Sequence, residues 1–169
     1  MVQRESDGIW ITLKEEIHAA PGEVAACVAD AAGLCRWLAV AAEYPPEAGA
    51  TLSIAWDRTW AHSTDVRILL YECIRAHDGF ARVRWEWYPS TIDVSADERP
   101  VPVELSVTPL PDRGGDSGGA RVILRHGPFG EDPETLLVVA DSAESWRWYL
   151  CNLRSVLEQK HDMRAVRPL

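Results

Sequence analysis

Positively charged side chains are scarce in this chain. Lysine and arginine together number 17, against 26 aspartates and glutamates, which gives a formal net charge of −9. A nucleic-acid-binding surface needs a positive footprint, because binding displaces cations from the phosphates. Docking on an anionic membrane has the same requirement. We therefore expect neither nucleic acid nor an anionic membrane surface as a partner.

Paired cysteines are also missing. The four cysteines are far apart in the sequence, at Cys27, Cys35, Cys73 and Cys151. No two of them form a C-x-x-C pair, so the spacing fits neither a zinc site nor a redox motif. We expect four free thiols, no metal and no other cofactor.

Long apolar runs are absent as well. No stretch approaches the length needed to span a bilayer, so membrane insertion is not expected. Arg4, Glu5 and Asp7 stand where the apolar core of a signal peptide would lie. The alanine-, arginine- and glycine-rich composition is typical of a GC-rich bacterial genome, and we expect a cytoplasmic, bacterial protein.

The length of 169 residues suits one domain with a substantial core. Such a chain buries roughly 70% of the surface that its unfolded form exposes. There are no internal repeats. We expect a single domain over residues 1–160 and a loose, basic tail over residues 161–169.

A strand followed by two short helices is predicted near the N-terminus. Residues 9–18 alternate between apolar and polar side chains at their start, as a half-buried strand does. Pro21 suits the first turn of a helix, because its φ is fixed and its missing N–H is not needed there. Gly33 is expected to end that helix, and a second short helix carries Trp37.

Five further strands are predicted before the last helix, over residues 51–56, 65–74, 80–88, 101–109 and 121–126. The alternation is clearest in residues 80–88, where Val83, Trp85 and Trp87 share one side. Asp132 and Pro133 can then cap and begin a long helix. A long amphipathic helix that follows a run of strands must bury its apolar stripe on the sheet, and a curved sheet would enclose a cavity beneath it.

Several short motifs occur in a characteristic order along the chain. They are Pro21 to Val24, Leu34-x-x-Trp37, Val83-x-Trp85-x-Trp87, Leu124-x-His126-Gly127 and Trp146-x-x-x-Leu150-x-x-Leu153. In this order the chain resembles the START-like, or SRPBCC, helix-grip superfamily. The closest likeness is to bacterial relatives of the C-terminal domain of the activator of the heat-shock protein 90 ATPase. Ser145 departs from the pattern, since many relatives have glycine directly before the helical tryptophan.

The resemblance implies an α+β helix-grip fold. A curved antiparallel β-sheet of about six strands would wrap around a long C-terminal α-helix, with two short helices after the first strand. In this fold the concave face of the sheet holds the ligand.

The eight tryptophans are the main candidates for a binding site. Indole offers a flat apolar surface and one N–H donor, which suits planar ligands. Core packing is the competing explanation, and it is favoured for Trp37 and Trp146. The predicted ligand-binding residues are Trp37, Trp56, Trp85, Trp87, Leu105, Leu124, His126, Trp146, Tyr149 and Leu150.

His126 has two interpretations. It could donate a hydrogen bond to a ligand carbonyl, or it could be a structural histidine bonded to backbone, which we favour. No catalytic residue is assigned, because no arrangement of Tyr, Arg and His identifies an acid–base pair.

Residues 115–119 spell the segment around the nucleophile of chymotrypsin-like serine proteases, Gly-Asp-Ser-Gly-Gly. The chain is too short for two packed barrels, and no suitably placed histidine accompanies Ser117. Glycine, aspartate and serine are common in turns, so we interpret this segment as a hairpin loop.

Binding of a small hydrophobic or aromatic molecule between the sheet and the last helix is the leading prediction. A polyketide cyclase- or aromatase-like enzyme that uses the same cavity is one alternative, and a co-chaperone-like interaction module is another. Residues 136–140 are apolar nearly all round the helix, which favours either a homodimer or a lid over the pocket.

Overall fold

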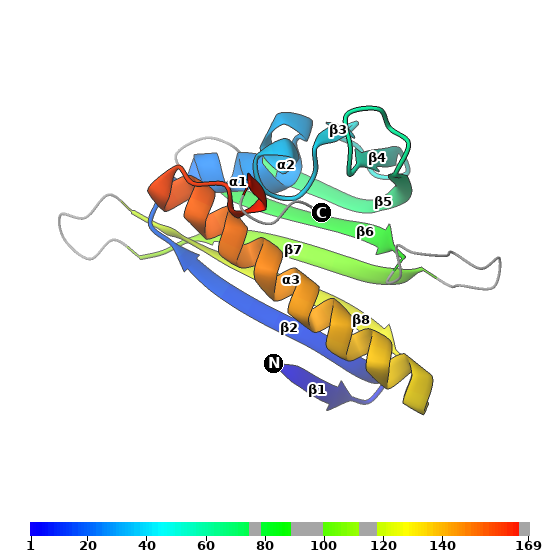
Figure 1. The fold of residues 1–169 in the computed structure, drawn as a ribbon. Helices are drawn as coiled ribbons and strands as arrows, with labels where there is room; N and C mark the ends of the chain where they lie inside the picture. Colours follow the sequence, from blue (N-terminus) through cyan, green and yellow to red (C-terminus); the bar gives the residue numbers. More distant parts are fainter. Residues whose placement is uncertain (75–78, 89–99, 112–117, 166–169) are drawn as a thin grey trace.

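Eight antiparallel strands form one sheet, and a long helix lies diagonally across one face of it (Figure 1). The computed structural model describes residues 1–74, 79–88, 100–111 and 118–165. The strands are β1 (Val2–Glu5), β2 (Gly8–Ile17), β3 (Ala41–Glu43), β4 (Thr51–Ala55), β5 (Ser63–Ile74), β6 (Phe80–Trp87), β7 (Val101–Pro109) and β8 (Ala120–Phe129). Their order in the sheet is β1-β2-β8-β7-β6-β5-β4-β3.

The sheet has two strands more than the expected six. All six predicted strands are present, as β2 and β4 to β8. The additional strands, β1 and β3, form the two edges of the sheet. The four residues of β1 are exposed or half-buried, and β3 is only three residues long. Neither strand therefore has the buried alternation that a sequence pattern reveals.

Strand register brings the apolar residues together on the face that carries the helices. Trp85 lies opposite Val103, and Val103 lies opposite His126 in the next strand. Leu105 and Leu124 form a second buried pair across β7 and β8. The alternate residues point to the other face, where arginines form exposed ion pairs such as Arg82 with Glu104 and Arg121 with Glu16.

Two short helices cover one end of this face. α1 (Pro21–Ala29) begins at Pro21 as predicted and packs on β5, β6 and β7, while α2 (Ala31–Trp37) lies beside β3 and the last helix. The prediction that Gly33 ends the first helix is wrong. The break is at Asp30, whose side chain caps α2, and Gly33 lies within α2. Glycine is required there because a Cβ would collide with the Ala26 carbonyl.

The long helix α3 (Pro133–Gln159) carries the predicted cap, with the Asp132 side chain accepting from the Thr135 N–H. After it, Met163–Ala165 form a 3-10 turn. Arg164 Nη2 donates to the Cys35 carbonyl at 2.8 Å and pairs with Asp162 at 2.7 Å. The segment expected to be a loose tail from residue 161 therefore begins with an anchored turn. Ser117 and most of the protease-like segment lie outside the described residues.

Candidate functional site

A cluster of aromatic rings lies between α3 and the strands β6 and β8. We define the aromatic cluster by the rings of Trp56, Trp85, Trp87, His126, Phe129, Trp146 and Tyr149. Its centre is the pair Trp87 and Trp146, whose ring centroids are 5.0 Å apart. Trp87 comes from β6 and Trp146 from α3, so this contact joins the helix to the sheet.

Strand alternation positions the two tryptophans of β6. Trp85 and Trp87 are two residues apart, so they point to the same face, and their ring centroids are 6.4 Å apart. Trp85 is fully buried, and its Nε1–H donates to the Tyr44 hydroxyl at 3.1 Å. Burial raises the pKa of Tyr44 well above its ordinary value, so this hydroxyl stays protonated at neutral pH.

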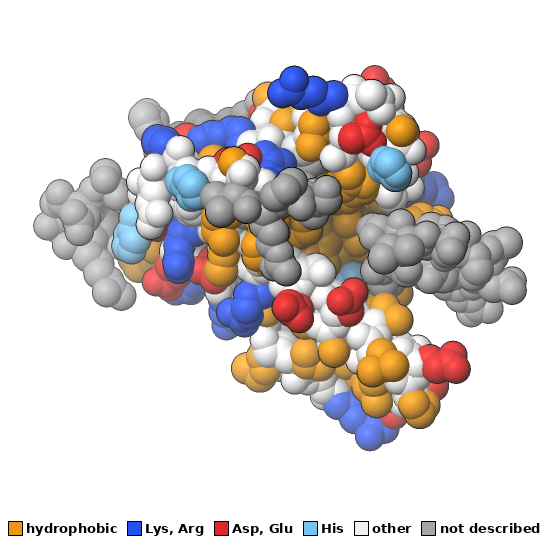
Figure 2. Space-filling model, viewed as in Figure 1, with side chains coloured by type: hydrophobic (Ala, Val, Ile, Leu, Met, Phe, Trp, Pro, Cys, Tyr) orange, Lys and Arg blue, Asp and Glu red, His pale blue; other side chains and the backbone are white. Residues whose placement is uncertain are grey.

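Trp56 and Tyr149 lie at the solvent side of the cluster. Both are partly buried, and their ring centroids are 6.2 Å apart. Burial raises the pKa of Tyr149, so its hydroxyl is also neutral. Figure 2 shows hydrophobic side chains gathered in a recess between α3 and the β3–β4 end of the sheet. The aromatic cluster therefore has both a deep, packed side and a side that approaches the surface.

A compact loop holds Trp56 in place. The Trp56 backbone N–H donates to the His62 carbonyl at 2.9 Å. Between them, the Asp57 carboxylate accepts bonds from Thr59 and from His62. These hydrogen bonds, above all the one from the Thr59 hydroxyl, hold the pKa of Asp57 below its ordinary range. Trp60, in the same loop, has a φ of 62° and is 36% exposed.

His126 is fully buried at the inner side of the cluster. Its Nδ1 accepts a hydrogen bond of 3.1 Å from Trp146 Nε1. Burial lowers the pKa of His126 to about 3, so the ring is neutral at pH 7. Since Nδ1 accepts, the single proton must be on Nε2. The Val101 backbone offsets part of the pKa shift, and the buried Nε2 has no hydrogen-bond partner.

Three buried polar atoms of this region have no hydrogen-bond partner. They are Trp56 Nε1, His126 Nε2 and Ser142 Oγ. Ser142 is four residues before Trp146 and therefore lies on the same side of α3, one turn away. A fourth such atom, Thr12 Oγ1, belongs to a position that alternates with buried Ile11 and Leu13. A buried donor without a partner costs about 1 to 3 kcal/mol. Three such atoms around one group of rings indicate a place where a polar group from outside could be accepted.

The structure brings most of the predicted ligand-binding residues together. Trp56, Trp85, Trp87, His126, Trp146 and Tyr149 form ring contacts with one another, and Leu105, Leu124 and Leu150 are buried in the same core. Trp37 lies apart on α2, where its Nε1–H donates to the Cys27 carbonyl at 2.9 Å. In the described part of the chain its ring contacts no other aromatic ring. Whether any of these residues binds a ligand remains a prediction.

Sequence reasoning missed Tyr44, Phe129 and Ser142. Tyr44 directly follows the short β3, which has no sequence signal of its own. Ser142 could have been found, because it continues the four-residue spacing from Trp146 back along the buried face of α3. A polar residue on that face is the kind of exception that calls for an explanation.

The described residues contain no candidate metal site, and among them Arg164 is the one cation that acts on Tyr149. Within the four described stretches, no group of three His, Cys, Asp or Glu side chains could hold a metal ion. Arg164 acts on Tyr149 electrostatically, but its guanidinium is already paired with Asp162. Of the helices in the described part of the chain, none is both long and apolar enough to cross a membrane.

Comparison with solved structures finds the same arrangement in other proteins. The chain superimposes on the protein SSP2350 from Staphylococcus saprophyticus with a TM-score of 0.63 and 15% identity, covering 92% of this chain and 96% of that one. It superimposes on the Aha1 dimer from Colwellia psychrerythraea with a TM-score of 0.60 and 16% identity, covering 88% and 96%. The chain has a helix-grip fold. This is the fold of the START-like, or SRPBCC, superfamily, as the order of motifs predicted.

A further similar structure is DynU16, a putative protein in the dynemicin biosynthetic locus, with a TM-score of 0.60 and 16% identity. The match covers 90% of this chain but only 48% of that one, so this helix-grip chain spans about half the length of DynU16. No family model matches the chain. No curated protein matches it either. At these identities the likeness concerns the fold alone.

Proposed function

We propose that this helix-grip protein binds a small, neutral, planar aromatic molecule that carries a carbonyl oxygen. The ligand would lie against the aromatic cluster, between β6, β8 and α3. The observation that carries the proposal is the set of three unpaired buried polar atoms, Trp56 Nε1, His126 Nε2 and Ser142 Oγ. Trp56 Nε1 can only donate, and His126 Nε2 carries the proton because Nδ1 accepts from Trp146, so both atoms favour a hydrogen-bond acceptor on the ligand.

The electrostatics of the cluster favour a neutral ligand over an anion. His126 is uncharged at neutral pH, because burial lowers its pKa to about 3. Arg164, which acts electrostatically on Tyr149, is neutralised by Asp162 at 2.7 Å. A carboxylate would therefore lose its hydration without gaining an unpaired positive charge. A ketone or quinone oxygen loses less on burial and can use the same donors.

Binding is favoured over acid–base catalysis. An efficient proton-transfer group has a pKa near the working pH. The pKa of His126 is about 3, and the pKa values of Tyr44 and Tyr149 are raised by burial. These shifts all move away from neutrality, so no specific observation supports the cyclase or aromatase alternative. The co-chaperone alternative likewise rests on the fold alone.

A matched pair of ligands tests the proposal directly. 9-Fluorenone and fluorene have the same ring system, and only fluorenone has a carbonyl. We expect isothermal titration to give about tenfold tighter binding of fluorenone, the effect of one added hydrogen bond. Trp56→Phe keeps a ring but removes the Nε1–H donor, and it should remove most of that preference. Trp10→Phe is the control, since Trp10 Nε1 is already bonded to Asp7. Equal affinity for the two compounds, or no binding of either, contradicts the proposal.

We also propose that the chain forms a homodimer. Leu136 and Leu137, in the apolar segment noted above, are 46% and 75% exposed at the start of α3. Exposed leucines in adjacent positions favour a protein partner. The similar protein from Colwellia psychrerythraea was solved as a dimer, which makes a second copy the first partner to consider. A cytoplasmic location stays a prediction.

A further inference from the structure

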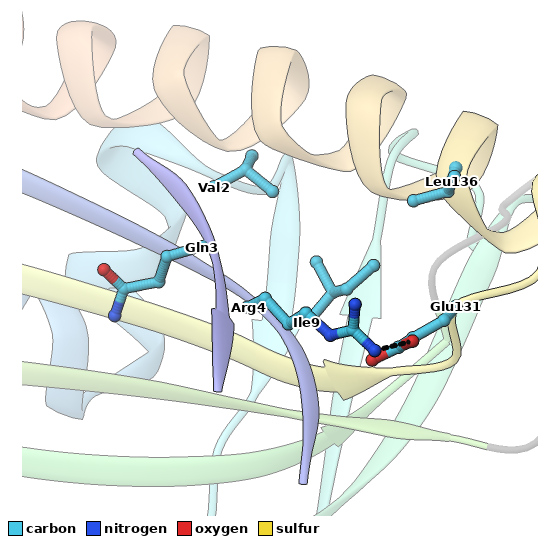
Figure 3. A pocket seen from close by; sticks show the side chains of 6 residues that line it. All are labelled: Val2, Gln3, Arg4, Ile9, Glu131 and Leu136. Carbon is cyan, nitrogen blue, oxygen red and sulfur yellow. Dashed lines mark hydrogen bonds and ion pairs between the residues drawn. The ribbon is translucent and has the colours of Figure 1, made fainter. Parts of the chain in front are cut away.

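A groove separates the edge strand β1 from the start of α3. It is lined by Val2, Gln3, Arg4, Ile9, Glu131 and Leu136 and has a volume of about 290 Å³. Figure 3 shows Val2, Ile9 and Leu136 between strand and helix, with the Arg4–Glu131 ion pair at one end. Small-molecule pockets usually enclose about 300 to 1,000 Å³. This groove is smaller and lies at the surface, which favours the insertion of a protein side chain over a small ligand.

The outer edge of β1 offers backbone groups for strand pairing. Met1 and Thr12 exchange both backbone hydrogen bonds, at 2.7 and 2.8 Å. In an antiparallel pair, hydrogen-bonded and non-bonded positions alternate. Val2 and Arg4 are therefore non-bonded positions opposite Ile11 and Ile9, and their N–H and C=O groups point away from β2. No described strand lies beyond β1 in the sheet.

The charges at this edge are balanced within the monomer. Arg4 pairs with Glu131 at 2.5 Å, and Arg125 pairs with Glu5 at 2.8 Å. Two arginines thus meet two carboxylates here, although the whole chain has a net charge of −9. Along β1 itself these charges therefore cancel, whereas the start of α3 also carries the exposed carboxylates of Asp132 and Glu134, which favours the strand as the line of contact between two copies.

We infer that two copies of the chain associate through antiparallel pairing of their β1 strands, with the start of each α3 flanking the joint. This inference rests on the proposed homodimer and assigns its surface. Pairing centred on Gln3 sets Val2 opposite Arg4 of the partner subunit, so that the outward backbone groups bond to each other. The alternative centred on Arg4 sets two arginines opposite each other, which destabilises a strand pair.

The same register explains the apolar groups beside the strand. Val2 is 48% exposed, and Leu136 and Leu137 are 46% and 75% exposed. Val2 and Arg4 lie on the α3 side of β1, because they stand opposite the buried Ile11 and Ile9. The two-fold pairing brings Val2 of the partner subunit toward the groove and covers the exposed leucines. One interface would therefore give hydrogen-bond partners to the outward N–H and C=O groups of β1 and would bury Val2, Leu136 and Leu137.

Sedimentation of the full chain across a concentration series tests this inference. We expect the wild type to reach twice the chain mass of 18.8 kDa. Arg4→Pro removes an outward N–H without removing a bond to β2, and it should weaken the dimer by about ten- to a hundredfold, since two symmetric hydrogen bonds are lost. Arg4→Ala keeps the N–H and should change the dimer affinity much less. Circular dichroism checks that each variant is folded.

A second pair of variants tests the apolar part of the surface. Leu137→Asp should weaken the dimer by at least about tenfold, because it puts a charge where apolar surface would be buried. Leu69→Asp is the matched control, since Leu69 is 37% exposed on β5, far from β1 in the sheet order. A wild type that stays monomeric overturns both the homodimer and this surface. A dimer that is insensitive to Arg4→Pro and Leu137→Asp overturns the surface and leaves the homodimer standing.

Discussion

Two buried regions of the molecule, each built around tryptophan, treat their polar atoms in opposite ways. In the first, Trp37 Nε1 bonds the Cys27 carbonyl, and Asn152 bonds the Trp37 carbonyl at 2.8 Å and the Met163 N–H at 2.7 Å. We call this set, together with Arg164, the helix corner. In the aromatic cluster, Trp56 and His126 each keep an unpaired polar atom, as does Ser142 one helical turn away from Trp146.

The difference separates Trp37 from Trp56, whose buried Nε1–H has no acceptor. It does not separate Trp37 from Trp85 or Trp146, because their N–H groups donate to Tyr44 and to His126. A closed corner in which every named donor has an acceptor is complete without a ligand. The aromatic cluster has buried N–H donors without acceptors, and a ligand or an ordered water can supply those acceptors.

The largest effect is expected in the helix corner. Trp37→Ala should lower the free energy of unfolding by about 3 to 5 kcal/mol, the range for removing a buried aromatic side chain. Urea denaturation measures it. The exposed-loop variant Trp60→Ala is the control and should stay within about 1 kcal/mol of the wild type. A Trp37→Ala loss as small as that of the control would mean that the corner is not tightly packed.

The next effect concerns the amide that ties α2 to the end of α3. Asn152→Ala leaves the Trp37 carbonyl and the Met163 N–H without their partner. The buried Trp37 carbonyl at about 1 to 3 kcal/mol and the part-buried Met163 N–H at about 1 kcal/mol predict a loss of about 2 to 4 kcal/mol in urea unfolding. Asn152→Asp keeps an acceptor for the Met163 N–H, but it places a buried carboxylate against the Asp162 carboxylate and the Trp37 carbonyl, so it should lose at least as much stability as the alanine variant. No difference between the alanine variant and the wild type would contradict the closed character of the corner.

Acid should destabilise the protein through the aromatic cluster. The pKa of His126 falls from 6.5 to about 3 on folding, so between these values the unfolded chain binds a proton that the native state excludes. Stability present above pH 6.5 should therefore be lost as the pH falls, by about 1.4 kcal/mol per unit from this group.

The slope between pH 5 and 6.5 checks this expectation, since carboxylates titrate mainly below that window. His126→Asn should flatten the slope of unfolding free energy against pH by about one proton. An unchanged slope in His126→Asn would mean that the imidazole is solvated in the native state.

The smallest change in the free energy of unfolding is expected for Ser142→Ala, and it should be a gain where Asn152→Ala gives a loss. Ser142→Ala removes a buried hydroxyl that has no partner, so stability should stay the same or rise by up to about 1 kcal/mol. The same variant should weaken binding of a carbonyl ligand. Chemical denaturation in the absence of ligand measures the first part. A loss above about 1 kcal/mol would indicate a native hydrogen bond of Ser142 and remove it from the candidate site.

The fold could be predicted from the sequence because its signals are local and repeated. Asp132 and Pro133 begin α3, Pro21 begins α1, and the alternation around Trp85 and Trp87 assigns β6 to a half-buried strand. The edge strand β1 could not be predicted, since Val2 and Gln3 are exposed and carry no buried pattern.

The site could be predicted only in outline. Placing tryptophans on the concave strands identified Trp56, Trp85 and Trp87, because strand period alone determines the face. The sequence favours core packing for Trp37, but the hydrogen bond from its Nε1–H to the Cys27 carbonyl could not be predicted from residue spacing. Ser142 became a candidate only once its missing partner was visible.

The most direct test of the central claim is a two-dimensional NMR spectrum of the tryptophan indole N–H groups during titration with 9-fluorenone. We expect the Trp56 Nε1–H resonance to shift strongly downfield as its proton gains an acceptor, and the resonance of Trp37 Nε1–H, already bonded to the Cys27 carbonyl, to stay in place. If the Trp56 signal is unmoved at saturating ligand, or if Trp37 moves as much, spare donors do not mark a binding site in this protein.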